Sequence, residues 1–284
     1  MGYSLDASTS TTIVDGTSIN ASVASASGSH TLHVKAWGNQ GAACVTDVSI
    51  DVLVSAALSV VPSLAASISS IQTLGSWIAS NDSASGGGAA SGSMSIVGSP
   101  SQSGPTREFA TSYSNYGDER YSTTFGDDTV STNFLYDGWV YLTSSSSDIA
   151  NLEMDINQVM ANGQTVLFGF QCDGYSSTWD YTVNKGTPQS PNDQWLHSSA
   201  YCNPRGWGIN TWHHVQIYFS RDDSGNVTYH CVWLDNLQEN INATVSSAFA
   251  LGWAPTLLTN FQVDGLGASG SSIVYLDNLT IYRW

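Results

Sequence analysis

The stretch of residues 151–160 constrains the fold most strongly, because its side chains alternate in character. Asn151, Glu153, Asp155 and Asn157 share one parity, and the residues between them are apolar. A period of two is typical of a β-strand that turns one face to the core and the other to solvent. The stretch therefore predicts a strand whose polar face carries two carboxylates one side-chain step apart.

The spacing of these two carboxylates indicates a functional site. Along one face of a strand, Glu153 and Asp155 would stand roughly 6–7 Å apart, where like charges repel each other. On an ordinary solvated face, lysine or threonine would tend to stand in place of one of the two acids, which would relieve this repulsion. We therefore interpret the pair as the centre of a cleft that binds or cleaves a sugar.

Residues 153–156 read Glu-Met-Asp-Ile, which resembles the active-site strand of jelly-roll β-glucanases (glycoside hydrolase family 16) and related cellobiohydrolases. The family pattern is Glu-x-Asp-x-Glu, or Glu-x-Asp-x-x-Glu with a β-bulge. The resemblance implies that Glu153 is the nucleophile and that Asp155 is the auxiliary carboxylate. The last Glu, which is the acid/base of the family, is replaced by an amide: Asn157 without a bulge, or Gln158 with one.

This replacement affects the predicted function. Retaining hydrolysis needs a group that gives a proton to the leaving oxygen and later takes one from water, and an amide cannot do so. General acid–base help contributes a factor of about 10²–10⁴ in rate. Three explanations remain: a binding protein descended from an enzyme, an enzyme that uses another acid, and an engineered inactive variant.

The sequence from residue 71 to residue 284 reads as strands and turns. Strands are predicted at 93–97, 107–113, 120–125, 134–143, 149–159, 165–172, 178–183, 195–202, 211–220, 227–237, 257–263 and 273–282. Stretches 211–217 and 274–281 resemble strands of laminin-G-like and carbohydrate-binding jelly rolls. The predicted fold class is all-β, with a two-sheet β-sandwich of the concanavalin-like jelly-roll type at residues 71–284.

Residues 1–54 predict a separate short β module. Residues 28–38 resemble the penultimate strand region of bacterial Ig-like repeats. The length is about half of the ~100 residues of a full sandwich, so we expect a truncated Ig-like module that acts as a spacer. Residues 55–70 are rich in alanine, serine, valine and leucine, and are expected to form a linker.

The composition limits the partners of the chain. It has 23 acidic and 7 basic residues, a net charge of -16. Such a chain is repelled by nucleic acid and by anionic lipid, and a polyuronate is disfavoured for the same reason, whereas a neutral polysaccharide is not. No apolar run approaches the ~20 residues of a membrane span, so no membrane insertion is expected. We expect a secreted bacterial protein, an excised piece of a longer exported chain, that is monomeric.

Neighbouring predicted strands supply candidate substrate-binding residues. If consecutive strands lie side by side, Trp139 and Tyr141 face the same side as Glu153, with Gln171 and Asp173 on the following strand. Trp139 and Tyr141 could instead cover a second hydrophobic layer, and Asp173 could simply cap a turn. Asn157, or Gln158 with a bulge, would complete this set.

His214 is the further candidate, because His213 shares its parity with apolar residues of the same strand. If the chain is an enzyme after all, Asp173 or His214 is the expected replacement acid. The separation of the catalytic pair would then be diagnostic, since retaining pairs stand ~5–5.5 Å apart and inverting pairs ~6.5–9.5 Å apart.

Four cysteines and one aspartate complete the predictions. Cys172 and Cys202 each end a strand-like run beside a loop, and we predict a disulfide between them, with Cys44 and Cys231 free; four reduced thiols are the alternative. No cofactor is required. Similar final strands in sugar-binding jelly rolls imply a structural calcium ion at Asp277; a surface or turn-capping aspartate is the alternative.

These observations lead to one preferred function and one alternative. We predict a secreted carbohydrate-recognition protein that binds a neutral β-linked polysaccharide of the β-glucan type in a concave groove. The alternative is an endo-acting glycoside hydrolase with Glu153 as nucleophile and a non-standard general acid. A surface adhesin without a sugar role would need the groove to be filled or blocked.

Overall fold

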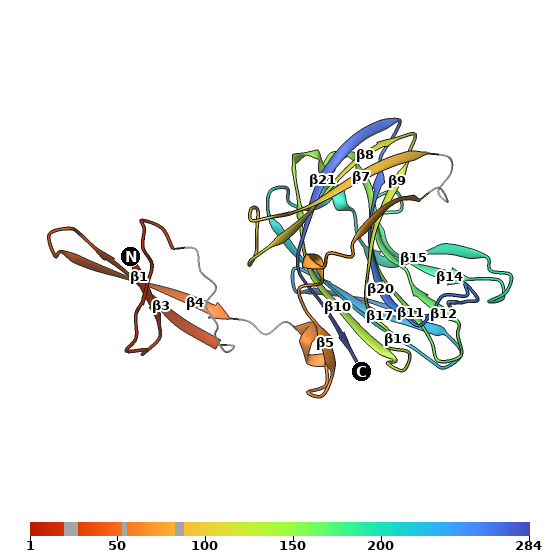
Figure 1. The fold of residues 1–284 in the computed structure, drawn as a ribbon, viewed down its shortest axis with the longest axis horizontal. Helices are drawn as coiled ribbons and strands as arrows, with labels where there is room; N and C mark the ends of the chain where they lie inside the picture. Colours follow the sequence, from red (N-terminus) through yellow and green to blue (C-terminus); the bar gives the residue numbers. More distant parts are fainter. Residues whose placement is uncertain (20–27, 53–55, 83–87) are drawn as a thin grey trace. The chain divides into compact units, whose positions relative to one another are not determined.

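The computed structural model describes residues 1–19, 28–52, 56–82 and 88–284, which form two compact units, Met1–Leu58 and Ser59–Trp284 (Figure 1). The first unit holds a four-stranded antiparallel sheet in the order β2-β1-β3-β4. Its strands are β1 (Gly2–Leu5), β2 (Thr12–Ile13), β3 (Gly28–Trp37) and β4 (Ala43–Val52). The likeness of this unit to an Ig-like repeat stays a prediction.

The second unit contains two antiparallel sheets, and we call the first of them the back sheet. It has eight strands, with the order β18-β17-β16-β10-β21-β8-β7 and β5 paired with β21. The strands are β5 (Ala66–Ile68), β7 (Ala89–Val97), β8 (Thr106–Ser114), β10 (Asn133–Leu142), β16 (Trp212–Arg221), β17 (Asn226–Leu234), β18 (Leu237–Ser246) and β21 (Ser269–Arg283). Residues 66–68, which were expected in a linker, therefore belong to the sandwich.

The other sheet, the front sheet, has nine strands in the order β15-β14-β13-β11-β20-β9-β6, with β12 paired with β11 and β19. The strands are β6 (Ile78–Asp82), β9 (Asp118–Gly126), β11 (Ile149–Val159), β12 (Thr165–Phe168), β13 (Phe170–Asp173), β14 (Thr178–Asn184), β15 (Asp193–Tyr201), β19 (Ala248–Phe249) and β20 (Leu257–Gly265). The two sheets pack face to face (Figure 1).

The helices among the described residues are short 3₁₀ turns: η1 (Ala56–Val60), η2 (Ile71–Thr73), η4 (Ser144–Asp148) and η5 (Pro204–Gly206). None of them has the length or the apolar character needed to cross a membrane. The predicted all-β fold with a two-sheet sandwich is confirmed.

The core lies between the two sheets. On β11, Leu152, Met154 and Ile156 have no exposed surface, as the alternation of the sequence predicts. Aromatic rings fill the space around them, and the rings of Phe109 and Phe261 stack with centroids 5.1 Å apart. Burial of each such side chain contributes roughly 1.5–3 kcal/mol, so this inner layer fixes which face of each strand points outward.

All twelve predicted strands are present, but one assumption about their order is wrong. The strand predicted at 165–172 is divided at Gly169 into β12 and β13. More importantly, β10 and β11 do not lie side by side: β10 pairs with β16 and β21, and β11 pairs with β12, β13 and β20. The turn η4 takes the chain from the back sheet to the front sheet between them.

Candidate functional site

The polar face of β11 lines a groove of about 700 Å³ on the outer side of the front sheet. Its carboxylates are Asp82, Asp118, Glu153, Asp155, Asp193 and Asp264. Its amides are Asn151, Asn157, Gln171, Gln194, Asn260 and Gln262. Arg120 is the one basic side chain in the lining that the structure describes, so the groove is strongly acidic.

Glu153 occupies the centre of a row of polar side chains that crosses the sheet. It pairs with Gln262 of β20 on one side and with Gln171 of β13 on the other. Gln262 Nε2 donates to Glu153 Oε1 at 2.8 Å and to Asp264 Oδ1 at 3.0 Å, so one amide joins two carboxylates. Burial and the charge of Asp155 raise the pKa of Glu153 well above its ordinary value.

Asp155 lies in the neighbouring row, opposite Asn260. The break in the strand at Gly169 leaves the N–H of Phe170 free of the ladder, and it donates to Asp155 Oδ1 at 2.8 Å. Burial raises the pKa of Asp155 to about 7, although the Phe170 N–H and Asn260 lower it. A Cβ at Gly169 would lie 2.5 Å from Thr182 Cγ2, so this position cannot carry a side chain without displacing its neighbour.

Three aspartates stand side by side at one end of the groove. Asp118 of β9 pairs with Asp82 of β6 and with Asp264 of β20. Burial raises the pKa of Asp118 to about 8, with a further contribution from the charges of Asp264 and Asp82, and burial raises that of Asp264 to about 7. The nearest base, Arg120, donates to Asp82 Oδ2 at 3.4 Å. Asp118 Oδ2 has no hydrogen-bond partner in the described structure.

The other end of the groove is apolar and aromatic. Trp195 of β15 and Trp253, which precedes β20, line it together with Leu251 and Leu258. Trp253 keeps 41% of its surface exposed, which leaves its ring available to a ligand. The groove therefore joins an apolar, aromatic wall to a polar floor of amides and carboxyl groups.

Four of the residues predicted to form the site do come together. Glu153, Asp155, Asn157 and Gln171 all line the groove. Asn157 pairs with Leu258 of β20 and with Leu167 of β12, and its Oδ1 has no partner among the described residues.

Gln158 does not belong to this group. The pairing of β11 with β20 is regular from Asn151 to Gln158, so no bulge carries Gln158 round to the groove face. Its side chain is fully buried: Nε2 donates to the carbonyl oxygens of Asp128 and Ser131, and Oε1 accepts from Arg221 Nε at 2.6 Å. The bulged alternative is therefore wrong, and Asn157 occupies the third position of the motif.

Trp139, Tyr141 and His214 also lie elsewhere, on the outer side of the back sheet. Trp139 and Tyr141 are on β10 and His214 is on β16, which pairs with it. The rings of Trp139 and His214 stack with centroids 4.3 Å apart, and His214 Nε2 contacts Asp137 Oδ1 at 2.7 Å. Their prediction rested on adjacency of consecutive strands, which the sandwich does not have here, so none of the three reaches Glu153.

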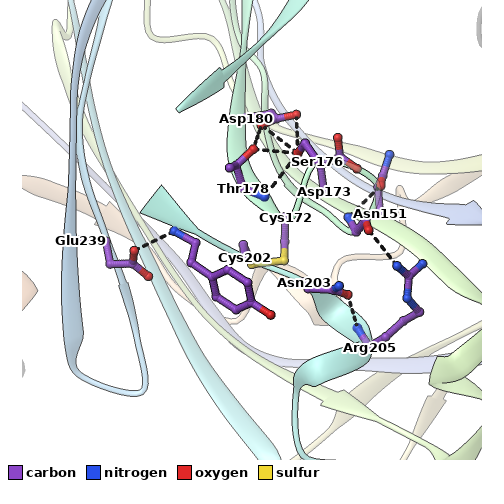
Figure 2. The surroundings of a disulfide bond; sticks show 12 residues. Asn151, Cys172, Asp173, Ser176, Thr178, Asp180, Cys202, Asn203, Arg205 and Glu239 are labelled. Carbon is purple, nitrogen blue, oxygen red and sulfur yellow. Dashed lines mark hydrogen bonds between the residues drawn. A yellow bond between two sulfur atoms is a disulfide. The ribbon is translucent and has the colours of Figure 1, made fainter. Parts of the chain in front are cut away.

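The predicted disulfide between Cys172 and Cys202 is confirmed, with Cα atoms 5.2 Å apart, and Cys44 and Cys231 are free. Figure 2 shows Asp173 next to this bond, close to Asp180, Ser176 and Thr178. Asp173 Oδ1 accepts from the N–H of Tyr175 at 2.6 Å, as the turn-capping alternative expects. Asp173 lies on the front sheet, in the row of Asn151, but does not line the groove.

Asp277 is fully buried within the second unit, away from the groove. Its carboxylate accepts from Gln72 Nε2, Ser101 Oγ, Gln102 N, Ser103 N, Thr106 Oγ1 and Asn278 N. Calcium needs six to eight oxygen ligands, whereas four of these six partners are nitrogen donors that must face the carboxylate themselves. The residues around Asp277 therefore do not fit a calcium ion, and the arrangement ties residues 101–106 to β21.

Sequence reasoning missed the residues that β20, β9 and β15 contribute to the groove. The signal was present for β20, because Asn260, Gln262 and Asp264 alternate with Thr259, Phe261 and Val263 as the residues of β11 do. Nothing in the sequence tells which strand pairs with β11. Trp253 could not be found, because it lies in a loop without a periodic pattern.

Among known proteins, the similarity found is to solved structures. No protein-family model and no curated protein matches the chain. Among solved structures, a β-sandwich carbohydrate-binding module is similar over 98% of this chain and 84% of its own, at 12% identity and a TM-score of 0.40. The cellulose-induced protein Cip1 is similar over 72% of this chain and 90% of its own, at 14% identity and a TM-score of 0.40. Arcelin-5, a lectin-like defence protein of Phaseolus vulgaris, is similar over 74% of this chain and 99% of its own, at 10% identity and a TM-score of 0.39.

Proposed function

We propose that the chain binds a neutral β-linked polysaccharide of the β-glucan type in the groove of the front sheet. The volume of about 700 Å³ lies within the range of ~300–1,000 Å³ that is typical of ligand sites. Trp195 and Trp253 offer ring faces to the apolar face of a sugar, and the floor offers hydrogen-bonding groups to its hydroxyls.

The row of Gln262, Glu153 and Gln171 is the observation that carries this proposal. A sugar hydroxyl both donates and accepts, and this row places an acceptor next to amides that can do either. Gln262 Oε1 and Gln171 Oε1 are buried and have no partner in the described structure, so the floor of the groove has unused capacity to accept hydrogen bonds. Because Arg120 is the one basic side chain in the described lining of the groove, an anionic glycan would find little to pair with, and a neutral glycan is favoured.

The test is incubation with a panel of glucans, xylans and galactans, scored for both retention and new reducing ends. The proposal predicts retention on a β-glucan without new reducing ends, and loss of that retention in Glu153→Ala. Retention that is equal on a polyuronate, or that survives Glu153→Ala, would contradict the proposal. Trp139→Ala on the back sheet is the matched control and should bind as the unchanged chain does.

Hydrolysis remains the second candidate, because one amide nitrogen joins Glu153 to Asp264. With the shared nitrogen 2.8 Å from Glu153 Oε1 and 3.0 Å from Asp264 Oδ1, these two oxygens are at most 5.8 Å apart, the sum of the two distances, which is compatible with the ~5–5.5 Å of a retaining pair and not with the ~6.5–9.5 Å of an inverting pair. The raised pKa of Glu153 suits a general acid better than the nucleophile that the family resemblance implies. In this case new reducing ends appear with the unchanged chain and disappear in Glu153→Gln, while binding is kept.

The disulfide supports the accompanying proposal that the chain is secreted. Disulfides form and persist in oxidising compartments, and this one joins Cys172 of β13, in the front sheet, to Cys202 just after β15. The polysaccharide would then be met outside the cell.

A further inference from the structure

A second group of side chains on the front sheet has the composition of a metal site. Asp173, Asp180 and His197 come from the adjacent strands β13, β14 and β15. One oxygen or nitrogen atom from each of the three lies within 4.8 Å of those from the other two. His197 Nδ1 is 2.8 Å from Asp180 Oδ2. Figure 2 shows the two aspartates beside the disulfide.

This group holds two carboxylates, and Arg205, which donates to the carbonyl oxygen of Gly174 next to Asp173, forms no ion pair with them in the described structure. Asp180 has no exposed surface and Asp173 keeps 6%. Among the described residues neither forms an ion pair with lysine or arginine, and His197 is the only ion-pair partner of Asp180. Two carboxylates brought together under burial need a shared proton or a cation between them. Besides His197, Asp180 contacts the hydroxyls of Ser176 and Thr178, which bring no charge, and the carboxyl group of Asp173, with which a hydrogen bond needs a proton on one of the two acids.

The residue opposite Asp180 on the neighbouring strand has an unpartnered side-chain oxygen. Gln171 is directly opposite Asp180 across β13 and β14, and two residues from Asp173 on the same face. It is 97% buried, with 3% of its surface exposed, and its Oε1 has no hydrogen-bond partner in the described structure. Cross-strand neighbours have Cβ atoms roughly 5 Å apart, so this amide oxygen is within side-chain reach of Asp180.

The other histidine–aspartate pairs of the chain show that this arrangement is not ordinary here. The described pairs are His30–Asp6, His33–Asp47, His213–Asp235 and His214–Asp137. Each joins one imidazole to one carboxylate, and none of them belongs to a group of three ligand-type side chains. The imidazole of His197 instead has carboxylate oxygens of two aspartates within 4.8 Å.

We propose that Asp173, Asp180 and His197 bind a divalent first-row transition-metal cation of the Zn²⁺ type. Zn²⁺ binds histidine nitrogen and aspartate oxygen at ~2.0–2.2 Å, and three such ligands leave a fourth position to water or to a ligand. The donor set of one imidazole and two carboxylates favours such a cation over Ca²⁺, which takes oxygen ligands. His197 is exposed over 64% of its side chain, so the cation can enter from solvent.

The surroundings hold these ligands in place before a cation binds. Cys172 precedes Asp173, and its disulfide links β13 to the end of β15, the strand that carries His197. Two of the three ligands are fixed further by hydrogen bonds, Asp180 to Thr178 Oγ1 at 2.6 Å and Asp173 to the N–H of Tyr175. In the row that runs through Glu153, Gln171 and Asp180, the site is two strand spacings from Glu153, roughly 10 Å.

Zn²⁺ titration calorimetry on the full, untagged chain tests this proposal. The background is Cys44→Ser, which removes the exposed thiol as an alternative ligand. We expect one Zn²⁺ per chain, and an affinity at least 10-fold lower in His197→Ala. His214→Ala is the matched control: its imidazole also pairs with one aspartate, and its removal should leave the affinity unchanged.

Asp180→Asn is the second variant and should also lower the affinity at least 10-fold; because Asp180 is buried, its folded state is first confirmed by a thermal melt. His197 is largely exposed, so the result with His197→Ala does not depend on that control. X-ray absorption at the zinc edge should show one imidazole ligand. Absence of Zn²⁺ binding at millimolar concentration, or an affinity that His197→Ala leaves unchanged, would overturn the proposal. A chain that binds Zn²⁺ at this site but binds no glycan would contradict the proposed function and support the metal site.

Discussion

The outer faces of the two sheets carry the same kinds of side chain, but their carboxyl and amide groups differ in how many hydrogen-bond partners they have. On the back sheet, Asp137 accepts from His214 Nε2 at 2.7 Å and from Gln216 Nε2 at 2.8 Å, while Trp139 covers the imidazole ring. On the front sheet, Asp118 Oδ2 and the oxygens of Gln171 and Gln262 have no partner among the described residues.

The comparison shows that residue type alone does not mark a binding site. Both faces offer tryptophan, carboxylate and amide groups, and on the front sheet the described residues surround a groove with hydrogen-bonding capacity left over. Buried polar groups without partners cost free energy, roughly 1–3 kcal/mol each, which a ligand recovers on binding. We therefore expect the two faces to respond differently to equivalent changes.

The largest expected effect is on stability, through the cysteines. Cys172→Ser combined with Cys202→Ser should lower the free energy of unfolding by roughly 3–4 kcal/mol, because the disulfide closes a segment with a sequence separation of 30 residues. Urea unfolding measures the change. Cys231→Ala, which replaces the free buried cysteine of β17 in the back sheet, is the control and should cost much less. An equal loss of unfolding free energy in both variants would contradict a stabilising role of the disulfide.

A smaller effect separates the two amides of the motif. Gln158→Ala leaves Arg221 Nε and two carbonyl oxygens without their partner, which should lower stability by about 2–3 kcal/mol without changing glycan affinity. Asn157→Ala should instead weaken glycan binding and leave stability nearly unchanged, because the Asn157 side chain lines the groove. A glycan affinity that falls in Gln158→Ala but not in Asn157→Ala would show that Gln158, and not Asn157, occupies the third position of the motif.

The next effect is on binding, through the tryptophans. Trp253→Ala should weaken glycan binding by about 2 kcal/mol, roughly 30-fold, since it removes the exposed ring at the apolar end of the groove. Trp139→Ala on the back sheet should change the affinity less than twofold. Affinity electrophoresis in gels that contain β-glucan measures both variants, and a reversed order would move the site to the back sheet.

The smallest effect is a pH dependence of stability. Burial raises the pKa of Asp118 to about 8 and that of Asp155 to about 7, against ~3.9 in an unfolded chain. The folded chain thus keeps protons that the unfolded chain has lost, so stability should fall as pH rises from about 4 to about 8. The Tm should be higher at pH 5 than at pH 8.

Asp118→Asn should reduce this pH dependence and raise the Tm at pH 8, because it removes the buried charge. Asp137→Asn, on the back sheet, should leave the dependence in place and is the matched control. A Tm that rises between pH 5 and pH 8 would show that the carboxyl groups of the groove ionise at their ordinary pKa values.

The sequence predicted the local features of the molecule well. The alternation around Glu153 identified β11 and its two faces, because burial of every second side chain is a property of the strand itself. The pairing of Cys172 with Cys202 followed from their places at the ends of strands.

The arrangement of strands could not be predicted. Glu153 meets Gln262 across a sequence separation of 109 residues, and nothing near either residue encodes that pairing. Trp139 and His214 were misplaced for the same reason: the chain changes sheets at η4 between β10 and β11. The periodicity of a strand fixes its faces, whereas the choice of neighbour depends on the packing of the whole sandwich.

An NMR titration of the indole N–H signals tests the central claim most directly. The chain has ten tryptophans, and the signals of Trp195, Trp253 and Trp139 can be assigned from single alanine variants. On addition of a soluble β-glucan oligosaccharide, the account predicts shifts of the Trp195 and Trp253 signals and none of Trp139. Shifts confined to Trp139, or no shift at saturating oligosaccharide, would contradict it.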